Sequence, residues 1–215
     1  MNDSHYDSNT DMIAIIDYGM GNLRSIHNAL DKVGGNPVIV SDNNALLKAD
    51  ADAVVIPGVG SFGDAMRNLI PFSDRLFDLA DSGTPLLGIC IGMQVLFDRS
   101  EESDAAGFGI LAGDVTRLPD GVKIPQMGWN ELTIHRNNRD SDMLAGINDG
   151  DFFYFVHSYY CVPEDKRVIA ATTDYGVDMA AVVEKDNIHA VQFHPEKSSK
   201  KGLLILKNFV EMIKC

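Results

Sequence analysis

The sequence predicts an α/β fold, with a mostly parallel central sheet, helices on both of its faces and additional strands in the second half. Two observations carry this prediction. From Met12 onward, short apolar runs alternate with stretches in which apolar residues recur at helical spacing. The most informative motifs, around residues 58–60 and 90, directly follow apolar runs. Such positions meet at one edge of a parallel sheet, so we expect an active site there.

The first half is expected to alternate strands with helices. A buried strand over 12–17 leads through a loop into a helix with apolar residues from Leu23 to Val33, which Gly34 and Gly35 end. The other expected elements are strands over 38–40, 53–56 and 85–89 and helical stretches through 66–69, 76–80 and 91–97.

The second half is richer in strands. The expected elements are strands over 115–117, 130–134, 152–156, 168–172, 180–184 and 188–193, a turn at 185–187 and a closing amphipathic helix over 202–212. We find no repeat, low-complexity tract or linker, so residues 12–215 are expected to form a single domain. Residues 1–11 are polar and acidic, and we expect a frayed N-terminal extension.

Composition narrows the class of protein. The 215 residues carry a net charge of -13 and no long basic stripe, so nucleic acid is not an expected partner. The three cysteines show no metal-ligand spacing, so no metal and no cofactor is expected. No segment approaches transmembrane length and no signal-peptide run is found. We expect no membrane association and a cytoplasmic location.

The strongest local signal is Gly88-Ile89-Cys90-Ile91-Gly92, which joins an apolar strand to a helix. This is the pattern of a nucleophile elbow with cysteine in the serine position. The glycines permit a sharp turn, the positive end of the helix favours a thiolate, and the N–H of Ile91 is free to bind an oxyanion. A buried structural cysteine is the alternative, but the flanking glycines favour a nucleophile.

A cysteine nucleophile needs a base, and the base needs an orienting group. His194 follows an apolar run, and Glu196 lies two residues on, past a proline that takes the chain out of the sheet. We therefore expect Cys90, His194 and Glu196 to form a catalytic triad. His189 lies five residues before His194 on the same expected strand, so the two rings face opposite sides, which argues against a shared metal site.

These motifs resemble a known family. The pattern G-x-C-x-G-x-Q around Cys90, with a distant His-Pro-Glu, is similar to the signature of class I glutamine amidotransferases, and the resemblance extends from Met12 to Met212. It implies a flavodoxin-like glutaminase domain in which the triad hydrolyses glutamine to glutamate and ammonia. It also implies that Gln94 helps to hold the substrate glutamine.

Four further stretches, 15–25, 57–63, 125–130 and 154–159, resemble one branch of the family, the glutaminase subunits of imidazole glycerol phosphate synthases in histidine biosynthesis. In the loop Pro57-Gly58-Val59-Gly60, the glycines permit a backbone flip that points the Val59 N–H at the oxyanion. The related anthranilate synthase glutaminases usually read P-G-P-G, where the proline has no N–H to present. Val59 and Ile91 are thus the expected oxyanion hole.

The resemblance implies a partner and two further groups of residues. Ammonia is expected to pass to a (β/α)8-barrel cyclase, the other subunit of a heterodimer, which makes imidazole glycerol phosphate and an aminoimidazole carboxamide ribotide (AICAR). The residues expected at the partner interface are Tyr18, Asn22, Met127 and Trp129, although the last two fit a core position equally well. The residues expected to bind glutamine are Gly58, Gly60, Gln94, His157, Ser158 and Tyr159.

Two other functions stay open from the residues. A different cysteine hydrolase, for instance one acting on γ-glutamyl peptides, would share the elbow and the histidine but would need no ammonia-accepting partner. A non-enzymatic regulatory module would keep the fold, but the intact Cys90, His194 and Glu196 argue against it. Comparing the turnover of glutamine with that of a γ-glutamyl peptide separates the two enzymes.

Overall fold

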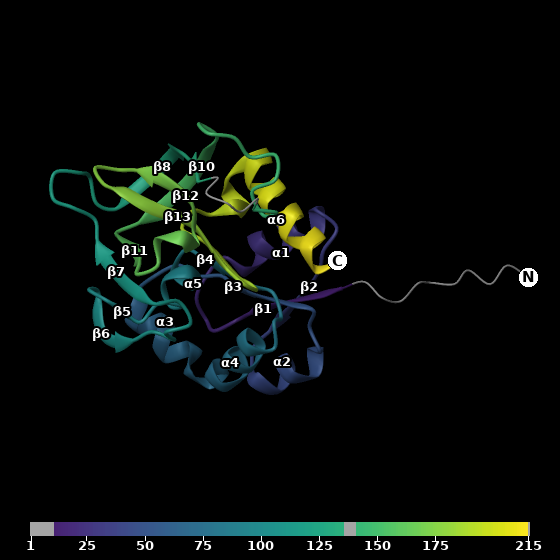
Figure 1. The fold of residues 1–215 in the computed structure, drawn as a ribbon. Coiled ribbons are helices and arrows are strands. Elements are labelled where there is room, and N and C mark those ends of the chain that lie inside the picture. Colours follow the sequence, from purple (N-terminus) through teal and green to yellow (C-terminus); the bar gives the residue numbers. More distant parts are fainter. Residues whose placement is uncertain (1–10, 136–140, 215) are drawn as a thin grey trace, which may run out of the picture.

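Among the described residues, the main sheet has eight strands in the order β2-β1-β3-β4-β14-β13-β12-β9 (Figure 1). The computed structural model describes residues 11–135 and 141–214, so all but Asp11 of the expected N-terminal extension lies outside the described residues. The strands of this sheet are β1 (Met12–Ile16), β2 (Asn36–Val40), β3 (Ala53–Ile56), β4 (Leu86–Ile89), β9 (Thr133–Ile134), β12 (Ile169–Asp174), β13 (Asp178–Lys185) and β14 (Ile188–Val191).

The sheet has a parallel part and an antiparallel part. β2, β1, β3, β4 and β14 run parallel, and β13, β12 and β9 follow in antiparallel pairs. β14 comes from near the end of the chain and lies beside β4, with Val191 opposite Ile89. The predicted α/β fold with a mostly parallel central sheet is thus confirmed, and its parallel strands end at one edge.

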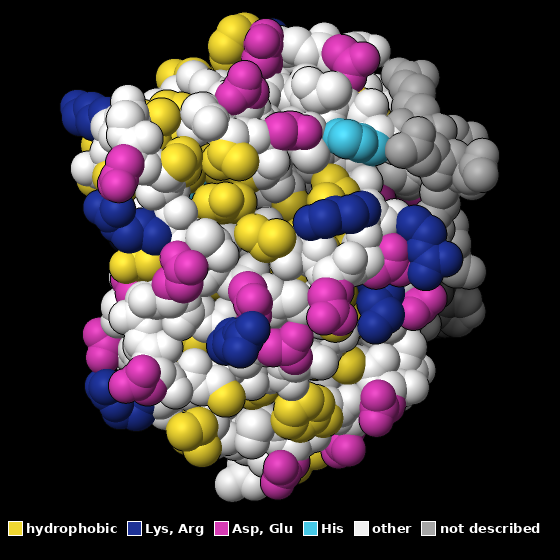
Figure 2. All heavy atoms as spheres, turned by 60° about the vertical axis from the view of Figure 1, so that its left-hand side comes forward, with side chains coloured by type: hydrophobic (Ala, Val, Ile, Leu, Met, Phe, Trp, Pro, Cys, Tyr) yellow, Lys and Arg dark blue, Asp and Glu magenta, His cyan; other side chains and the backbone are white. Residues whose placement is uncertain are grey.

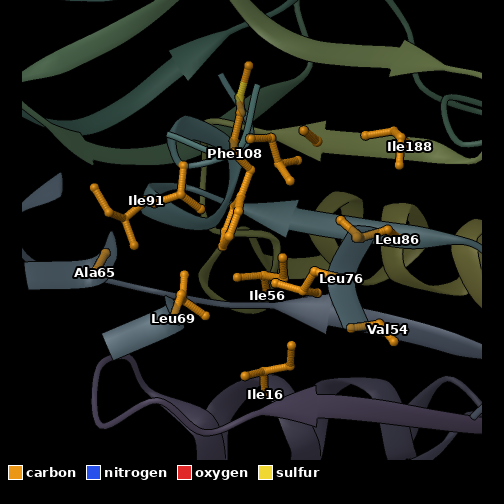
Figure 3. Packing of buried hydrophobic residues seen from close by; sticks show 14 of the residues in the cluster. Ile16, Val54, Ile56, Ala65, Leu69, Leu76, Leu86, Ile91, Phe108 and Ile188 are labelled. Carbon is orange, nitrogen blue, oxygen red and sulfur yellow. The ribbon is translucent and has the colours of Figure 1, made fainter. Parts of the chain in front are cut away.

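Helices cover both faces of the sheet because strand side chains point alternately to the two faces. In β1, Ile15 packs in a core cluster with α1 and α6, whereas its neighbour Ile16 packs in a second cluster with α2, α3 and α4. Figure 3 shows part of the second cluster, in which Leu69 of α3 and Leu76 of α4 pack near Ile56 of β3. The helices are α1 (Leu23–Lys32), α2 (Asn43–Ala49), α3 (Phe62–Leu69), α4 (Ser73–Asp81), α5 (Ile91–Gln94) and α6 (Ser199–Ile213).

Short polar side chains mark where three of these helices begin. Asn22, Asp42 and Ser61 precede α1, α2 and α3, and each accepts a hydrogen bond from the backbone N–H three residues further on, at 3.3, 2.8 and 3.3 Å. Each cap satisfies an N–H that has no partner inside the helix. Ser61 matters most for the site, because it starts α3 directly after the Pro57–Gly60 loop.

Two smaller sheets lie beside the main one (Figure 1). One pairs β8 with β10, and the other has the order β11-β7-β5-β6. Their strands are β5 (Arg99–Ser100), β6 (Ser103–Ala106), β7 (Gly113–Arg117), β8 (Gln126–Glu131), β10 (Phe152–His157) and β11 (Tyr159–Pro163). In the part of the chain that the structure describes, there are also three short 3-10 helices: η1 (Ile70–Phe72), η2 (Lys166–Val168) and η3 (Pro195–Lys197).

The structure corrects several predicted elements. The strand expected over 130–134 is two strands in different sheets, since β8 ends and β9 begins on either side of the buried Leu132. The strand expected over 188–193 ends at Val191, because the chain crosses toward β10, where the His194 N–H donates to the Tyr154 carbonyl at 2.9 Å. The helix expected over 91–97 ends at Gln94. The elements α2, β5, β6 and β11 were not predicted.

Within residues 11–135 and 141–214, no helix is both long enough and apolar enough to cross a bilayer.

Candidate active site

Three neighbouring strands bring the predicted site residues to one edge of the sheet. β4 lies between β3 and β14, and all three run parallel. The loop Pro57–Gly60 follows β3, Cys90 follows β4, and the segment leading to His194 follows β14. This strand order places the loop, the cysteine and the histidine side by side, although they are far apart in the sequence.

Cys90 sits in a sharp turn between β4 and α5. Its backbone has φ 54° and ψ -107°, a conformation that costs roughly 1–3 kcal/mol for a residue with a side chain. The turn is tight, because a Cβ on Gly92 would lie 1.8 Å from the Ile56 carbonyl oxygen and one on Gly88 would lie 2.6 Å from the Gly92 carbonyl oxygen. The expected strand-to-helix elbow is present, and both glycines are needed for it.

The Cys90 sulfur is surrounded by polar backbone and side-chain groups. Sγ lies 3.7 Å from the Val156 carbonyl oxygen and 3.7 Å from Nε2 of Gln192. Gln94 orients Gln192, because its Nε2 donates to the Gln192 Oε1 at 3.2 Å and to the Tyr159 carbonyl at 2.9 Å. Sequence reasoning missed Gln192, which looks like an ordinary polar residue at the end of an apolar run.

His194 and Glu196 form a buried pair. His194 Nδ1 lies 2.9 Å from Glu196 Oε1, with side chains 3% and 5% exposed. Burial favours the neutral ring, but interactions with Cys90 and Glu196 outweigh it and raise the pKa of His194 to about 9. Nε2 makes no hydrogen bond within the described part of the chain, which leaves it available to Cys90 and to a leaving group. The Ser198 hydroxyl fixes the backbone by donating to the His194 carbonyl at 2.6 Å.

A second buried imidazole, that of His157, lies near this pair. Burial lowers the pKa of His157 to about 4, and the charge of His194 contributes to this, so the ring is neutral near pH 7. Nδ1 lies 2.8 Å from the Tyr159 carbonyl oxygen and must therefore donate to it. His157 therefore shapes the connection from β10 to β11, and it does not compete with His194 for a proton.

A cavity of about 350 Å³ opens beside the Cys90 sulfur. It contains both negative and positive charge, because Glu102 and Lys197 belong to its wall. Neither residue was predicted to belong to the site. Glu102 lies in a turn beside a second glutamate, and Lys197 begins a basic cluster with Lys200 and Lys201, so both resemble ordinary surface charges in the sequence. The lining residues are Val59, Gly60, Cys90, Ile91, Gln94, Glu102, Pro125, Val156, His157, Ser158, Tyr159 and Lys197.

Gly58, which was expected to touch glutamine, lies beneath the cavity wall. A Cβ at this position would stand 2.0 Å from the Tyr18 hydroxyl and 2.0 Å from Cγ2 of Ile91. The glycine is therefore required by close packing under the loop. Ile91 opens α5, so its N–H has no acceptor inside the helix, and Val59 lies across from it with a half-exposed side chain.

The four residues expected at a partner interface fall into two groups. Tyr18 is only 5% exposed, so its expected place on a partner surface is wrong: it fills the space under the Pro57–Gly60 loop. Asn22 is exposed at the start of α1. Met127 and Trp129 are 63% and 51% exposed, so the alternative that they are core residues is wrong.

In the described residues, no group of three or more His, Cys, Asp and Glu side chains is arranged to hold a metal ion. The chemistry available at this edge is that of a thiol, an imidazole–carboxylate pair and oriented backbone N–H groups.

Known proteins resemble the chain closely. The family model for glutamine amidotransferase class-I matches residues 14–213. The HisH subunit of imidazole glycerol phosphate synthase from Methanothermobacter thermautotrophicus is 52% identical over 204 residues, which cover 94% of this chain and 100% of that protein. The subunit of the same name from Aquifex aeolicus is 50% identical over 198 residues, covering 91% of this chain and 94% of the relative.

Solved structures share the fold. A putative GMP synthase protein from Thermoplasma acidophilum superposes with a TM-score of 0.73 at 20% identity, covering 96% of this chain and 95% of that one. PurLQS from Thermotoga maritima superposes with a TM-score of 0.73 at 20% identity, covering 95% of this chain and 99% of that one. The solved structures show the shared fold, and the family model and the two HisH subunits show that the chain belongs to the class-I glutamine amidotransferases, among the HisH subunits of imidazole glycerol phosphate synthase.

Proposed function

We propose that this chain is the glutaminase subunit of an imidazole glycerol phosphate synthase, in which Cys90, His194 and Glu196 hydrolyse glutamine to glutamate and ammonia. The observation that carries the proposal is the position of Cys90 and the His194–Glu196 pair at the ends of two adjacent strands, beside a cavity with mixed charge. Relatives about half identical to the chain carry the name of this subunit.

The reaction runs through a thioester. The Cys90 thiolate attacks the side-chain amide carbon of glutamine, and the carbon–nitrogen bond breaks as His194 gives its proton to the departing ammonia. Water then adds to the thioester carbon, with His194 accepting a proton from it. The carbon–sulfur bond breaks, which releases glutamate and regenerates the Cys90 thiolate. Glu196 keeps the imidazole in the required tautomer and stabilises its charged form.

The negative charge that develops on the amide oxygen needs two donors. The N–H of Ile91, the first residue of α5, has no acceptor inside the helix and supplies one of them, and the N–H of Val59 supplies the second once the loop that follows β3 rotates. We propose that this rotation waits for the partner cyclase and its ligand. The isolated chain then hydrolyses glutamine slowly.

The cavity suits the two charges of an α-amino acid. We assign the substrate ammonium to the carboxylate of Glu102, one oxygen of which already accepts the Phe62 N–H at 2.7 Å. The substrate carboxylate is assigned to the backbone around Ser158 and Tyr159 and to the ammonium of Lys197, all of which line the cavity. The buried side chain of Gln94 forms the inner part of the cavity wall.

Ammonia is proposed to pass to a cyclase subunit with a (β/α)8-barrel fold, which makes imidazole glycerol phosphate and AICAR. The proposed contact surface is on β8 and β10, where Met127, Trp129 and Phe152 are 63%, 51% and 54% exposed. Exposed aromatic and methionine side chains are favoured at protein interfaces. Figure 2, viewed from the side of β7 and β11, shows hydrophobic side chains gathered among acidic and basic ones.

We further propose that residues 12–215 act as one domain, because the main sheet takes neighbouring strands from both halves of the chain. The cytoplasm stays the expected compartment, as a prediction from the sequence.

Co-expression with the cyclase of the same organism tests the function. We expect the two chains to co-purify and glutamine hydrolysis to rise when the cyclase ligand is added, with γ-glutamyl peptides turned over far more slowly. Cys90→Ala is expected to lower glutamine turnover by about a thousandfold or more while the complex and its use of added ammonia persist. Cys161→Ala, which removes the other described cysteine, is the control and keeps the turnover. Full activity without a partner, or full activity of Cys90→Ala, contradicts the proposal.

A further inference from the structure

We propose that Tyr18 is a positioning residue that anchors the oxyanion loop at Pro57, so that rotation of the loop is confined to the peptides around Val59. The inference rests on the proposed function, because it concerns the glutaminase site. It gives a role to a side chain that the sequence placed at the partner interface and the structure places under the loop.

The anchor is a hydrogen bond between neighbouring strand ends. Tyr18 lies just beyond β1, which pairs with β3, the strand that leads into Pro57. The Tyr18 hydroxyl donates to the Pro57 carbonyl oxygen at 2.7 Å, across 39 positions of sequence. Burial raises the pKa of Tyr18 well above its ordinary value, and the charge of Cys90 adds to this, so the hydroxyl keeps the proton that it donates.

Packing also holds this peptide. A Cβ on Gly58 would stand 2.0 Å from both the Tyr18 hydroxyl oxygen and Cγ2 of Ile91, so these two groups lie close together against the same side of Gly58. The peptide that joins Pro57 to Gly58 is therefore packed against Tyr18 and against the other oxyanion residue. Any shift of Tyr18 changes the position of Val59 relative to Ile91.

The far end of the loop has its own anchors. The Ser61 hydroxyl accepts the Asp64 N–H at 3.3 Å, and the Glu102 carboxylate accepts the Phe62 N–H at 2.7 Å. Between the two ends, Gly60 has φ +115°, a value that L side chains rarely adopt. Val59 thus lies in a short segment with both ends fixed, which limits the rotation to its own peptides.

A fixed Pro57–Gly58 peptide matters because an oxyanion donor stabilises the developing charge only at hydrogen-bond distance. Without the Tyr18 hydroxyl, the Pro57 carbonyl turns to find another donor and the loop samples orientations that miss the oxyanion. The groups assigned to substrate binding lie elsewhere in the cavity. Loss of the anchor should therefore lower kcat and leave KM for glutamine nearly unchanged.

The test compares Tyr18→Phe with Tyr175→Phe in the complex with the cyclase and its ligand. Tyr175 is the matched control, because its hydroxyl also donates to a backbone carbonyl, that of Lys123 at 2.9 Å, but on the exposed surface. We expect Tyr18→Phe to lower kcat for glutamine about five- to tenfold, with KM changed less than about twofold. Tyr175→Phe should match the wild type in both.

A second measurement does not depend on turnover. Hydrogen–deuterium exchange of the peptide covering Gly58 to Ser61 is expected to be faster in Tyr18→Phe and unchanged in Tyr175→Phe. Unchanged exchange, or a fall in melting temperature with kcat intact, overturns the anchor. A rise in KM alone also overturns it, because it assigns Tyr18 to substrate binding. If the wild-type complex does not hydrolyse glutamine, the proposed function is contradicted instead. The exchange measurement then still shows whether Tyr18 anchors the loop.

Discussion

The backbone N–H of Cys90 donates a 2.8 Å hydrogen bond to the carbonyl oxygen of Val191. This bond extends the parallel ladder between β4 and β14 by one step, to the point where both strands end. The main chain therefore sets the position of the sulfur relative to the segment that carries His194. Substitutions of side chains around His194 should therefore alter the orientation and charge of its ring more than the distance of its backbone from Cys90.

Replacing Glu196 by Gln tests the role of the carboxylate. The amide keeps nearly the same shape but removes the charge that stabilises the imidazolium and offers the wrong hydrogen-bonding group to Nδ1, 2.9 Å away. We expect kcat for glutamine to fall by about a thousandfold or more while the complex still forms and uses added ammonia. Steady-state kinetics and a melting curve of the purified complex measure the two effects.

The chain contains a matched control for this change. Glu184 also pairs with a buried histidine, His189, at 3.2 Å and five positions along the chain. The pair lies near the hairpin of β13 and β14, at the end of β14 opposite to the segment that carries His194. Glu184→Gln should change stability but leave glutamine turnover near that of the wild type. Equal losses of turnover in both variants would show that the effect of Glu196→Gln is a general one on folding.

The activity should fall at high pH. The pKa of His194 is about 9, and the ring must carry a proton to release ammonia. We expect kcat/KM for glutamine in the activated complex to fall about tenfold per pH unit above that value. A pH profile in which the alkaline limb lies near the ordinary value of 6.5 contradicts the raised pKa.

The titration of His194 also makes the stability of the fold depend on pH. Because the folded pKa of His194 is raised above its unfolded value of 6.5, its stabilising contribution is complete below pH 6.5 and is lost as the pH rises through about 9. The free energy of unfolding should therefore decrease over this interval. Cys90→Ala removes one of the two residues whose interactions raise the pKa of His194, so its unfolding free energy should vary less with pH. Denaturant titrations at several pH values compare the two slopes.

Local sequence patterns were sufficient for the parallel half of the fold. Apolar runs and helical spacing identify β1, β3, β4 and α1 without tertiary information, and Gly88 and Gly92 identify the elbow. The order of strands in a sheet is a tertiary property. The motifs placed Cys90 and His194 at the ends of strands, but that β14 lies beside β4, and so brings His194 toward Cys90, was not predicted and is seen only in the structure.

The missed features are short, polar or dependent on packing. β6 reads Ser-Asp-Ala-Ala and has no apolar alternation, and α2 starts with two asparagines, which favour caps over helix interiors. Glu102 belongs to a turn, where a carboxylate usually meets only water. Tyr18 lies in a loop, and loops are usually exposed; it is buried because Gly58 leaves room for its ring.

Truncating the proposed contact surface should weaken the complex without unfolding the chain. Trp129 and Met127 are more than half exposed, so their removal costs little packing in the free subunit. We expect Trp129→Ala to raise Kd for the cyclase about thirtyfold and Met127→Ala about tenfold, as measured by calorimetry. Ligand-stimulated glutamine turnover should return at higher cyclase concentration.

Ile70→Ala is the control for the loss of an exposed hydrophobic side chain. It is 62% exposed, close to the 63% of Met127, but it belongs to η1, between α3 and α4, away from β8 and β10. Ile70→Ala should leave Kd unchanged. If it weakens the complex as much as Met127→Ala does, the contact surface is not on β8 and β10.

A methyl group at position 92 should push the Cys90 turn away from β3, the strand against which it packs. A Cβ there would stand 1.8 Å from the Ile56 carbonyl oxygen, a backbone atom of β3 that cannot swing aside. Either the turn or the strand must move, and such overpacking costs about 3 kcal/mol. We expect Gly92→Ala to lower the midpoint of denaturant unfolding and to abolish glutamine hydrolysis.

Gly63→Ala gives the contrast that makes this result specific. Gly63 lies in α3, where a Cβ would meet Cβ and Oγ of Ser103 at 3.2 Å, a contact that a shift of Ser103 by a few tenths of an ångström relieves. Alanine also favours the helix over glycine by about 1 kcal/mol, so the net change in stability should be small. Because Gly63 is only three positions past Gly60, similar kinetics in Gly63→Ala and the wild type would show that the loop tolerates strain at its α3 end. Loss of activity in Gly92→Ala with unchanged stability would instead place the effect on the Cys90 turn alone.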